Sequence, residues 1–218
     1  MMDIYSIMKD DTIHRANEPA GPAREDESSG LSARIAQRIH SLRTGQRMSL
    51  EALAARSGVS RSMISLIERG RSSPTAVLLE KLAVGLNVSL ASLFDPPNGS
   101  ASPLSRRADQ LQWRDPASGY LRRNVSPGGA DSPLHIVEVE FPAGARVAYD
   151  TGPRQPRQWQ QVWVLQGCIE LSLGPEHHRL ETGDCLAMVL DRPITYHNPT
   201  PEPARYAVVL YREAGPWR

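Results

Sequence analysis

MSLEALAARSGVSRSMISLIERGRSSPT, residues 48–75, carries two short helical patterns separated by a turn at Gly58. Ser49 is suited to cap the first helix, and Ser60 is suited to cap the second. Apolar residues recur in both segments at the i, i+3, i+4 spacing of a single helix face. Gly58 tolerates the left-handed backbone that a tight turn between helices needs. The stretch therefore predicts two short helices that pack through their apolar faces.

The second of these helices has a polar outer face. Ile64 and Ile67 form its buried side, and arginines and serines are left pointing outward. Guanidinium and hydroxyl groups are the donors that contact base edges and phosphates. The pattern is typical of a helix-turn-helix whose second helix enters the major groove, with Glu68 turned back toward the helices in a structural role. The predicted DNA-binding residues are Ser49, Ser60, Arg61, Ser62, Ser65, Arg69 and Arg71.

Further helical patterns flank this motif. Residues 31–42 carry a stripe of leucine and isoleucine. Ser73-Pro74 is expected to open a fourth helix with proline at its first position, where the missing N–H costs nothing. Ser89 is suited to cap a last short helix that ends near Phe94. The pattern as a whole predicts five helices.

Three motifs in this region resemble the XRE-type, phage-repressor-like helix-turn-helix family. They are A-x3-G-V-S at 54–60, I-E-R-G-R at 67–71 and the S-P-T that follows shortly after. The resemblance covers residues 31–95 and implies an all-α, five-helix DNA-binding domain. A basic helical bundle that binds protein is the alternative interpretation.

The net charge of +1 hides an uneven distribution. Residues 31–94 contain nine Arg or Lys and three Glu, whereas residues 1–30 contain three basic and seven acidic side chains. Residues 111–218 are almost neutral, with eleven basic and twelve acidic side chains. Positive charge is concentrated where binding by counterion release requires it, so double-stranded DNA is the expected partner.

Hydropathy and cysteine spacing also indicate the cellular compartment in which the protein is expected. No apolar run is long enough to span a membrane, and the N-terminus lacks the apolar core of a signal peptide. Cys168 and Cys185 lie too far apart for a C-x-x-C motif. We expect a cytoplasmic protein with reduced thiols and no membrane partner. A thiol sensor remains the alternative if adjacent strands bring the two cysteines together.

Composition divides the chain into four parts: a disordered polar tail at 1–30, the helical domain at 31–95, a Pro/Ser-rich linker without helix at 96–112, and a β-rich domain at 113–218. In the last part the apolar period changes from 3.6 to 2. The expected strands are 120–125, 134–141, 160–166, 169–173, 185–189 and 206–211, and a hairpin turn at 174–176 is expected to leave His177-His178 solvated. Many short strands with regular turns predict a sandwich or closed barrel.

The β-rich part resembles the cupin family. The strings are QVWVLQGCIEL at 161–171, LETGDC at 180–185 and RPITYHNP at 192–199. The resemblance implies an all-β double-stranded β-helix, that is, a jelly-roll barrel. Regulators similar to this chain join a DNA-binding head to a cupin sensor domain.

This chain departs from the metal-binding cupin pattern. Aligned on Gly167 and Asn198, the four ligand positions fall at Arg154, Pro156, Gln160 and Ile194. These side chains are poor ligands for metals that prefer imidazole or carboxylate. His197 is not a substitute, because strand alternation places it on the opposite face from Tyr196. We therefore expect no metal and no other cofactor.

Strand alternation instead points Gln160 inward, toward a cavity for a small organic molecule. The predicted effector-binding residues are Tyr149, Arg154, Gln160, Met188 and Tyr196. Arg154 would favour a carboxylate or phosphate group on the ligand. The alternative is a barrel filled by its own side chains. Trp159 and Trp163 belong either to the core or to a dimer face.

The sequence thus predicts a transcriptional regulator, expected to be a repressor, that binds a palindromic operator and senses an effector. It is not expected to be an enzyme. A homodimer is expected, because two heads read half-sites one helical turn apart. The alternatives are a metal-dependent cupin enzyme of isomerase or dioxygenase type with a regulatory DNA-binding head, and a barrel that only dimerises.

Overall fold

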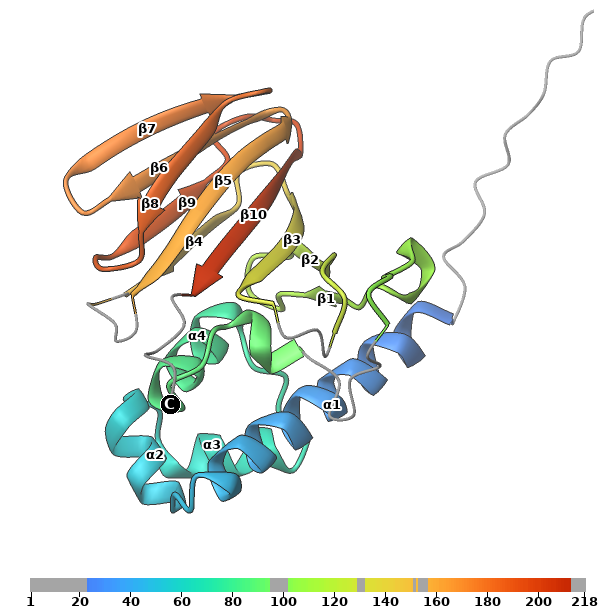
Figure 1. Ribbon diagram of the computed structural model, residues 1–218, viewed down its shortest axis with the longest axis vertical. Helices are drawn as coiled ribbons and strands as arrows, with labels where there is room; N and C mark the ends of the chain where they lie inside the picture. The colour runs from blue at the N-terminus through green and yellow to red at the C-terminus, as the bar shows by residue number, and fades with distance from the viewer. Residues whose placement is uncertain (1–22, 95–101, 129–131, 151, 153–156, 213–218) are drawn as a thin grey trace, which may run out of the picture.

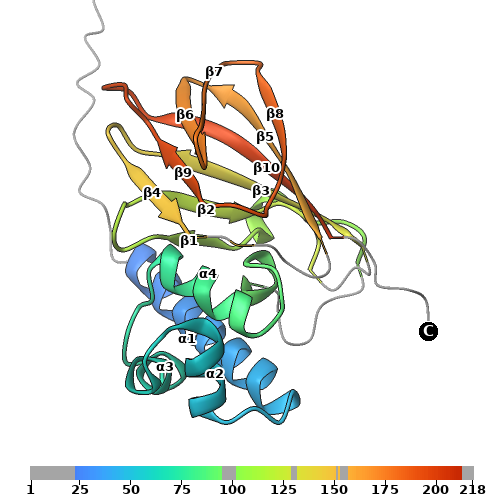
Figure 2. The ribbon, with the colours of Figure 1, turned by 90° about the vertical axis from the view of Figure 1, so that its left-hand side faces the viewer.

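A computed structural model describes residues 23–94, 102–128, 132–150, 152 and 157–212. A helical domain lies at one end, and a barrel of two antiparallel sheets is stacked on it (Figure 1). Helix α4 lies next to the barrel, whereas α2 and α3 lie at the far end of the helical domain in both ribbon views (Figures 1 and 2). The two predicted domains are therefore present, and they are in contact.

The helical domain consists of α1 (Ala23–Gly45), α2 (Leu50–Ser57), α3 (Arg61–Glu68), α4 (Ala76–Gly85) and the 3₁₀ turn η1 (Ala91–Phe94). The described residues of this domain thus hold four α-helices, not five, because the last predicted helix is a single 3₁₀ turn. Its predicted cap is confirmed, since the Ser92 N–H donates to Ser89 Oγ at 3.1 Å. Helix α1 begins at Ala23, eight residues before the boundary expected at residue 31.

Side-chain caps fix where the short helices start. Ser49 Oγ accepts from the Ala52 N–H, and Ser60 Oγ accepts from the Met63 N–H, as predicted. Between these helices Gly58 has a φ of 67°, the left-handed value expected for the turn. Helix α4 does not begin at Ser73-Pro74. Thr75 caps it by accepting from the Leu78 N–H, which moves its start to Ala76.

The core of the helical domain is apolar and closely packed. Ile39, Leu53, Ile64 and Leu79 are fully buried. Gly85 marks the crossing of α2 and α4, because a Cβ there would lie 2.8 Å from Ser57 Cβ. Only a residue without a side chain permits this close approach. No helix in the described part of the chain is long and apolar enough to cross a membrane.

The barrel consists of two sheets. One has the strand order β1-β2-β3-β10-β5-β8 and the other β4-β9-β6-β7. All strand pairs are antiparallel. The strands are β1 (Gln112–Arg114), β2 (Leu121–Asn124), β3 (Leu134–Phe141), β4 (Arg146–Tyr149), β5 (Gln158–Gln166), β6 (Cys168–Leu173), β7 (Glu176–Glu181), β8 (Cys185–Val189), β9 (Ile194–His197) and β10 (Ala204–Arg212). This is the double-sheet arrangement expected for a cupin-like fold.

Several local predictions for the barrel need correction. Strands β1, β4, β7 and β9 were not expected, and a 3₁₀ turn, η2 (Arg107–Asp109), interrupts the expected linker. His177 and His178 lie on strand β7 rather than in the hairpin turn, and His177 Nδ1 lies 2.9 Å from Ser172 Oγ. Short or polar strands such as these lack the apolar alternation by which a strand is recognised.

The described contacts between the helical domain and the barrel include the following three. Asp115 is 2% exposed and accepts from the Ala76 N–H, the first residue of α4, at 2.9 Å. Phe94 of η1 meets Trp113 of β1 edge to face, with ring centroids 5.6 Å apart. The Arg122 guanidinium of β2 lies over the Phe94 ring, with its central carbon 4.9 Å from the ring centroid. A carboxylate at a helix N-terminus and rings packed at the interface both favour one fixed arrangement.

Candidate DNA-binding surface and barrel cavity

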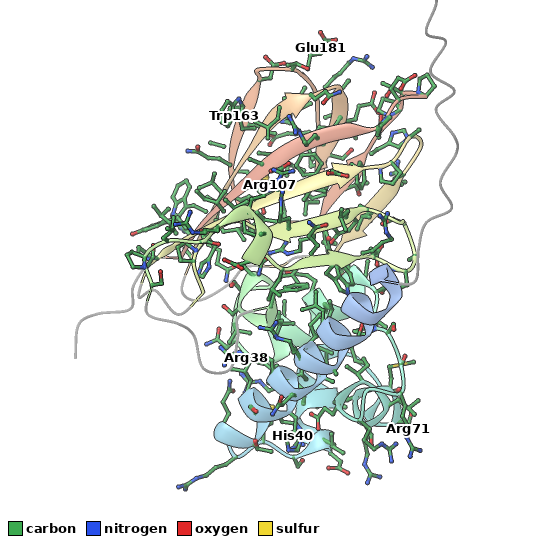
Figure 3. All side chains as sticks on the ribbon, turned by 90° about the vertical axis from the view of Figure 1, so that its right-hand side faces the viewer. Arg38, His40, Arg71, Arg107, Trp163 and Glu181 are labelled. Carbon is green, nitrogen blue, oxygen red and sulfur yellow. The ribbon has the colours of Figure 1, made fainter. Side chains whose placement is uncertain are left out.

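The predicted DNA-binding side chains lie at the end of the molecule remote from the barrel. Figure 3 shows Arg71 projecting from this end, with Trp163 on the barrel far from it. Arg61, Ser62, Arg69 and Arg71 are exposed, whereas Ser65 is half-buried. The exposed face of α3 is therefore open to a large polyanion.

The hydroxyl oxygens of the two serine caps, Ser49 and Ser60, accept from helix N–H groups, so each hydroxyl can still donate its hydrogen to DNA. Arg61 Nε lies 2.7 Å from Glu51 Oε1, but both side chains are about two-thirds exposed. Such exposed ion pairs are weak and screened by salt, so Arg61 is free to exchange Glu51 for a phosphate or base. Arg69 Nε donates to the Ser65 carbonyl, which holds its side chain along the helix.

Glu68 has the structural role predicted for it. Arg43 of α1 donates to its carboxylate through Nε at 2.6 Å and through Nη2 at 2.8 Å. His40 Nδ1 lies 3.0 Å from the same carboxylate. Burial raises the pKa of Glu68, but the hydrogen bonds from Arg43 and His40 outweigh it and lower the pKa below its ordinary value. This ion pair joins α1 to α3 and thereby fixes the α3 surface.

A cavity of about 70 Å³ lies inside the barrel, against the helical domain. One water needs roughly 10–15 Å³ of such space, so the cavity has room for a small organic molecule. Both domains contribute to its wall. The helical domain supplies Glu80, Ser89 and Leu90; the barrel supplies Tyr120, Arg122, Val139, Phe141, Val147, Tyr149, Gln158, Gln160, Leu190, Ile194, Tyr196, Tyr206, Val208 and Leu210.

Three of the five predicted effector-binding residues line this cavity. Gln160 Nε2 donates to Tyr196 Oη at 2.5 Å, and Tyr149 Oη lies 3.2 Å from Tyr120 Oη. Met188 is buried beside Gln160, with Sδ 3.8 Å from Nε2, but it is not part of the wall. Arg154 lies outside the described residues. The inward faces of β5 and β9 follow the predicted alternation, since Gln160 and Tyr196 are each 6% exposed.

Sequence reasoning missed Arg122, the buried cation of the cavity. It is 5% exposed, and burial lowers the pKa of its guanidinium. Burial also raises the pKa of Tyr120 to about 12 and raises the pKa of Tyr196, so these hydroxyls stay neutral near pH 7. A signal was available: neighbouring residues of a strand point to opposite faces, so the pair Arg122-Arg123 must place one arginine inward.

The described residues of the cavity do not provide a metal site. Gln160 and Ile194, two of the four ligand positions, point inward but are an amide and an alkyl group. Arg154 and Pro156, the other two, lie outside the described residues. Within the described ranges no three His, Cys, Asp or Glu side chains gather. His197 faces away, with Nδ1 3.1 Å from Glu170 Oε2.

The two cysteines are not brought together by adjacent strands. Cys168 is buried on β6 of the four-stranded sheet, and Cys185 is exposed on β8 of the six-stranded sheet. The condition for a thiol sensor built from this pair is therefore not met.

The outer face of the six-stranded sheet carries exposed apolar side chains. Trp159 and Trp163 of β5 are 43% and 49% exposed, so neither belongs to the core. Trp159 pairs in register with Tyr211 of β10, and Tyr211 pairs with Leu134 of β3. These three large exposed side chains form one row across three strands.

Comparison with known proteins agrees with this architecture. Residues 39–93 match the helix-turn-helix family model HTH_3. The chain is 27% identical over 168 residues to the HTH-type transcriptional regulator SutR of Escherichia coli, covering 77% of this chain and 89% of SutR. It is 42% identical over 55 residues to the uncharacterized HTH-type transcriptional regulator y4dJ of Sinorhizobium fredii, covering 25% of this chain and 71% of y4dJ.

One solved structure resembles both domains together. It is an HTH_3 family transcriptional regulator from Vibrio cholerae, with a TM-score of 0.70 and 26% sequence identity. The similarity covers 86% of this chain and 99% of that one. That solved structure therefore contains counterparts of both the helical domain and the barrel.

Proposed function

Because the chain belongs to the HTH-type transcriptional regulators of the XRE-type family, we propose that it is a cytoplasmic repressor that binds its operator through α3 and releases it in response to a small organic effector. The observation that carries this proposal is the cavity wall. It combines barrel residues with Glu80, Ser89 and Leu90 of the helical domain. A ligand in this space touches both domains at once.

The coupling follows from where the ligand would bind. An effector changes DNA binding only if its affinity differs between the DNA-competent and the DNA-incompetent arrangement. A ligand that contacts α4 and the segment before η1 has different contacts whenever the helical domain moves on the barrel. Gln160, Tyr196 and Arg122 are among the polar groups of a wall that also contains valine, leucine, isoleucine and phenylalanine, and such a mixed wall suits a small organic molecule.

We propose a homodimer that pairs through the outer face of the six-stranded sheet. The row Leu134, Tyr211 and Trp159, extended by Trp163, is an exposed apolar surface of the kind that marks protein contacts. Tryptophan and tyrosine are enriched in such interfaces. Pairing the barrels leaves each α3 free to read one half of a palindromic operator.

Sedimentation velocity tests the dimer. The parent should sediment as a dimer at micromolar concentration, and Trp159→Arg should sediment as a monomer. Glu181→Arg, on β7 of the other sheet, is the matched control and should remain dimeric. A parent that is monomeric with and without operator DNA refutes the proposal.

Two alternatives receive less support. A metal-dependent cupin enzyme needs three or four good donors, and the described ligand positions Gln160 and Ile194 do not provide them. A barrel that only dimerises does not require buried polar groups such as Arg122 and Gln160 on its inner wall.

Ligand screening tests the sensing role. A molecule that binds only the folded protein raises its stability by RT ln(1 + [L]/Kd). Hits from a thermal-shift screen of metabolites should weaken operator binding in a fluorescence-anisotropy titration. Hits that stabilise the protein but leave operator affinity unchanged contradict the sensing role.

A further inference from the structure

Arg122 combines deep burial with unused hydrogen-bonding capacity. Its side chain lines the cavity and is 5% exposed, yet Nε and Nη2 have no hydrogen-bond partner within the part of the chain that the structure describes. Burying donors without partners is costly, and buried charged groups in native proteins are normally paired. The Phe94 ring and the charge of Glu80 stabilise the guanidinium in part, but neither supplies a hydrogen bond to Nε or Nη2.

The two unused atoms form one edge of the guanidinium, and this edge matches a carboxylate. Elsewhere in the same protein, Arg43 uses Nε and Nη2 to donate to the two oxygens of Glu68 at 2.6 and 2.8 Å. Two parallel N–H groups of this kind bind a planar carboxylate through two bonds. Arg122 belongs to the cavity wall and has the same edge, and neither of its two atoms is bonded to a carboxylate of the described residues.

The other residues of the cavity wall indicate the chemistry of the ligand outside its carboxylate. Phe141, Val139 and Val208 are apolar and Tyr120 and Tyr196 are neutral hydroxyls, whereas Glu80 adds a carboxylate whose charge partly offsets the lowering of the Arg122 pKa by burial. The space of about 70 Å³ suits a molecule of a few non-hydrogen atoms. We propose that Arg122 binds the carboxylate of a small organic acid whose apolar body lies against the wall of the cavity.

The same arginine connects this ligand to the helical domain. Its guanidinium lies 4.9 Å from the centroid of Phe94, the last residue of η1. Phe94 in turn packs on Trp113, one of the contacts that dock the helical domain on the barrel. A carboxylate bound to Arg122 therefore acts on a group that belongs to the domain interface. That this acid controls DNA binding rests on the proposed function; that it binds at Arg122 does not.

The variant Arg122→Met tests the site. It keeps roughly the length of the side chain and removes the charge. Because Arg122 also lies over the Phe94 ring and interacts with the charge of Glu80, each variant's response to a ligand is measured as the shift from its own unliganded melting temperature. Arg123→Met is the matched control. Arg123 is on the same strand and 6% exposed, but it is paired with Glu138 at 2.5 Å. Arg122→Lys keeps the charge and removes the two-bond edge.

The probes are butyrate and benzoate, each compared with its neutral amide at equal ionic strength, and inorganic phosphate. We expect a carboxylate, but neither amide, to raise the melting temperature of the parent and of Arg123→Met. Arg122→Met should weaken carboxylate binding by at least about tenfold, because hydrogen bonds to charged groups are among the strong ones. The carboxylate affinity of Arg122→Lys should lie between those of the parent and Arg122→Met.

Three results would overturn the proposal: no stabilisation of the parent by either carboxylate, equal stabilisation by the amides, or an unchanged response in Arg122→Met. Stabilisation by phosphate but not by carboxylate overturns it as well, because the ligand would then be a different anion. A carboxylate that needs Arg122 for binding but leaves operator affinity unchanged upholds the site and contradicts the sensing role. The two failures are therefore distinguishable.

Discussion

Replacing Glu68 by alanine removes the carboxylate that joins α3 to α1. Its side chain is 7% exposed and that of Arg43 is 11% exposed, so solvent screens this pair far less than a surface pair. The substitution leaves Arg43 with its bond to the Met48 carbonyl but without the two bonds to Glu68. Breaking such a buried, two-bond pair from one side should destabilise the helical domain by about 3 kcal/mol.

Urea unfolding followed by helical circular dichroism measures this loss, with Glu51→Ala as the control. Glu51 pairs with Arg61 on the surface, where both side chains are about two-thirds exposed, so its removal should leave the unfolding midpoint unchanged. Wherever Glu68→Ala remains folded, its relative affinities for different DNA sequences should match those of the parent. A variant as stable as the parent, or one with an altered base preference, would refute the structural role.

The contribution of Glu68 to the free energy of unfolding should also depend on pH. Because its folded-state pKa is lowered, the stability it contributes is complete above its ordinary value of 4.5 and is lost as the pH falls through the lower folded-state value. The difference in unfolding free energy between parent and variant should therefore shrink below about pH 4.5. A difference that stays constant down to about pH 3 contradicts the assignment.

Four further predictions concern the two functional surfaces. Arg61→Ala should cost about 1–3 kcal/mol of operator binding and relax specificity at one base step, as measured by binding to a panel of single-base operator variants; equal loss at every variant argues against a base contact. Arg71→Ala should weaken operator and random DNA alike and lower the salt slope by about one, as seen in affinities measured over a range of salt; an unchanged slope removes Arg71 from the interface. Gln160→Leu, which also removes the partner of Tyr196, should abolish effector-dependent release from DNA; intact release excludes Gln160 from sensing. Elemental analysis of untagged protein purified without chelator should find no stoichiometric Zn, Fe, Mn or Ni, and finding one contradicts the metal-free cavity.

Local patterns predicted most of the helical domain and the long strands. Serine caps, the left-handed Gly58 and the apolar faces of α2 and α3 are properties of neighbouring residues, so they can be recognised without knowledge of the fold. Strands β3 and β8 were predicted with their observed bounds for the same reason. Strand alternation also predicts that Gln160 and Tyr196 point into the barrel, as observed.

Features that depend on contact between the domains could not be predicted. The start of α4 depends on Thr75 and on Asp115, which bonds Ala76 from 39 residues away. Arg122 is an intermediate case: the pair Arg122-Arg123 predicts one inward arginine, but the cavity around it also requires residues of the docked helical domain. The wall formed by Glu80 and Leu90 likewise results from docking and not from any local pattern.

Selection from a pool of random-sequence DNA duplexes tests the central claim, that this chain recognises DNA as a dimer through α3. Repeated rounds should enrich one two-fold symmetric site, with half-site centres separated by about 10–10.5 base pairs or a multiple of that spacing. Arg61→Ala, selected in parallel, should enrich a site degenerate at one position of each half. A pool in which no sequence is enriched, or an identical site for the parent and Arg61→Ala, would contradict the claim.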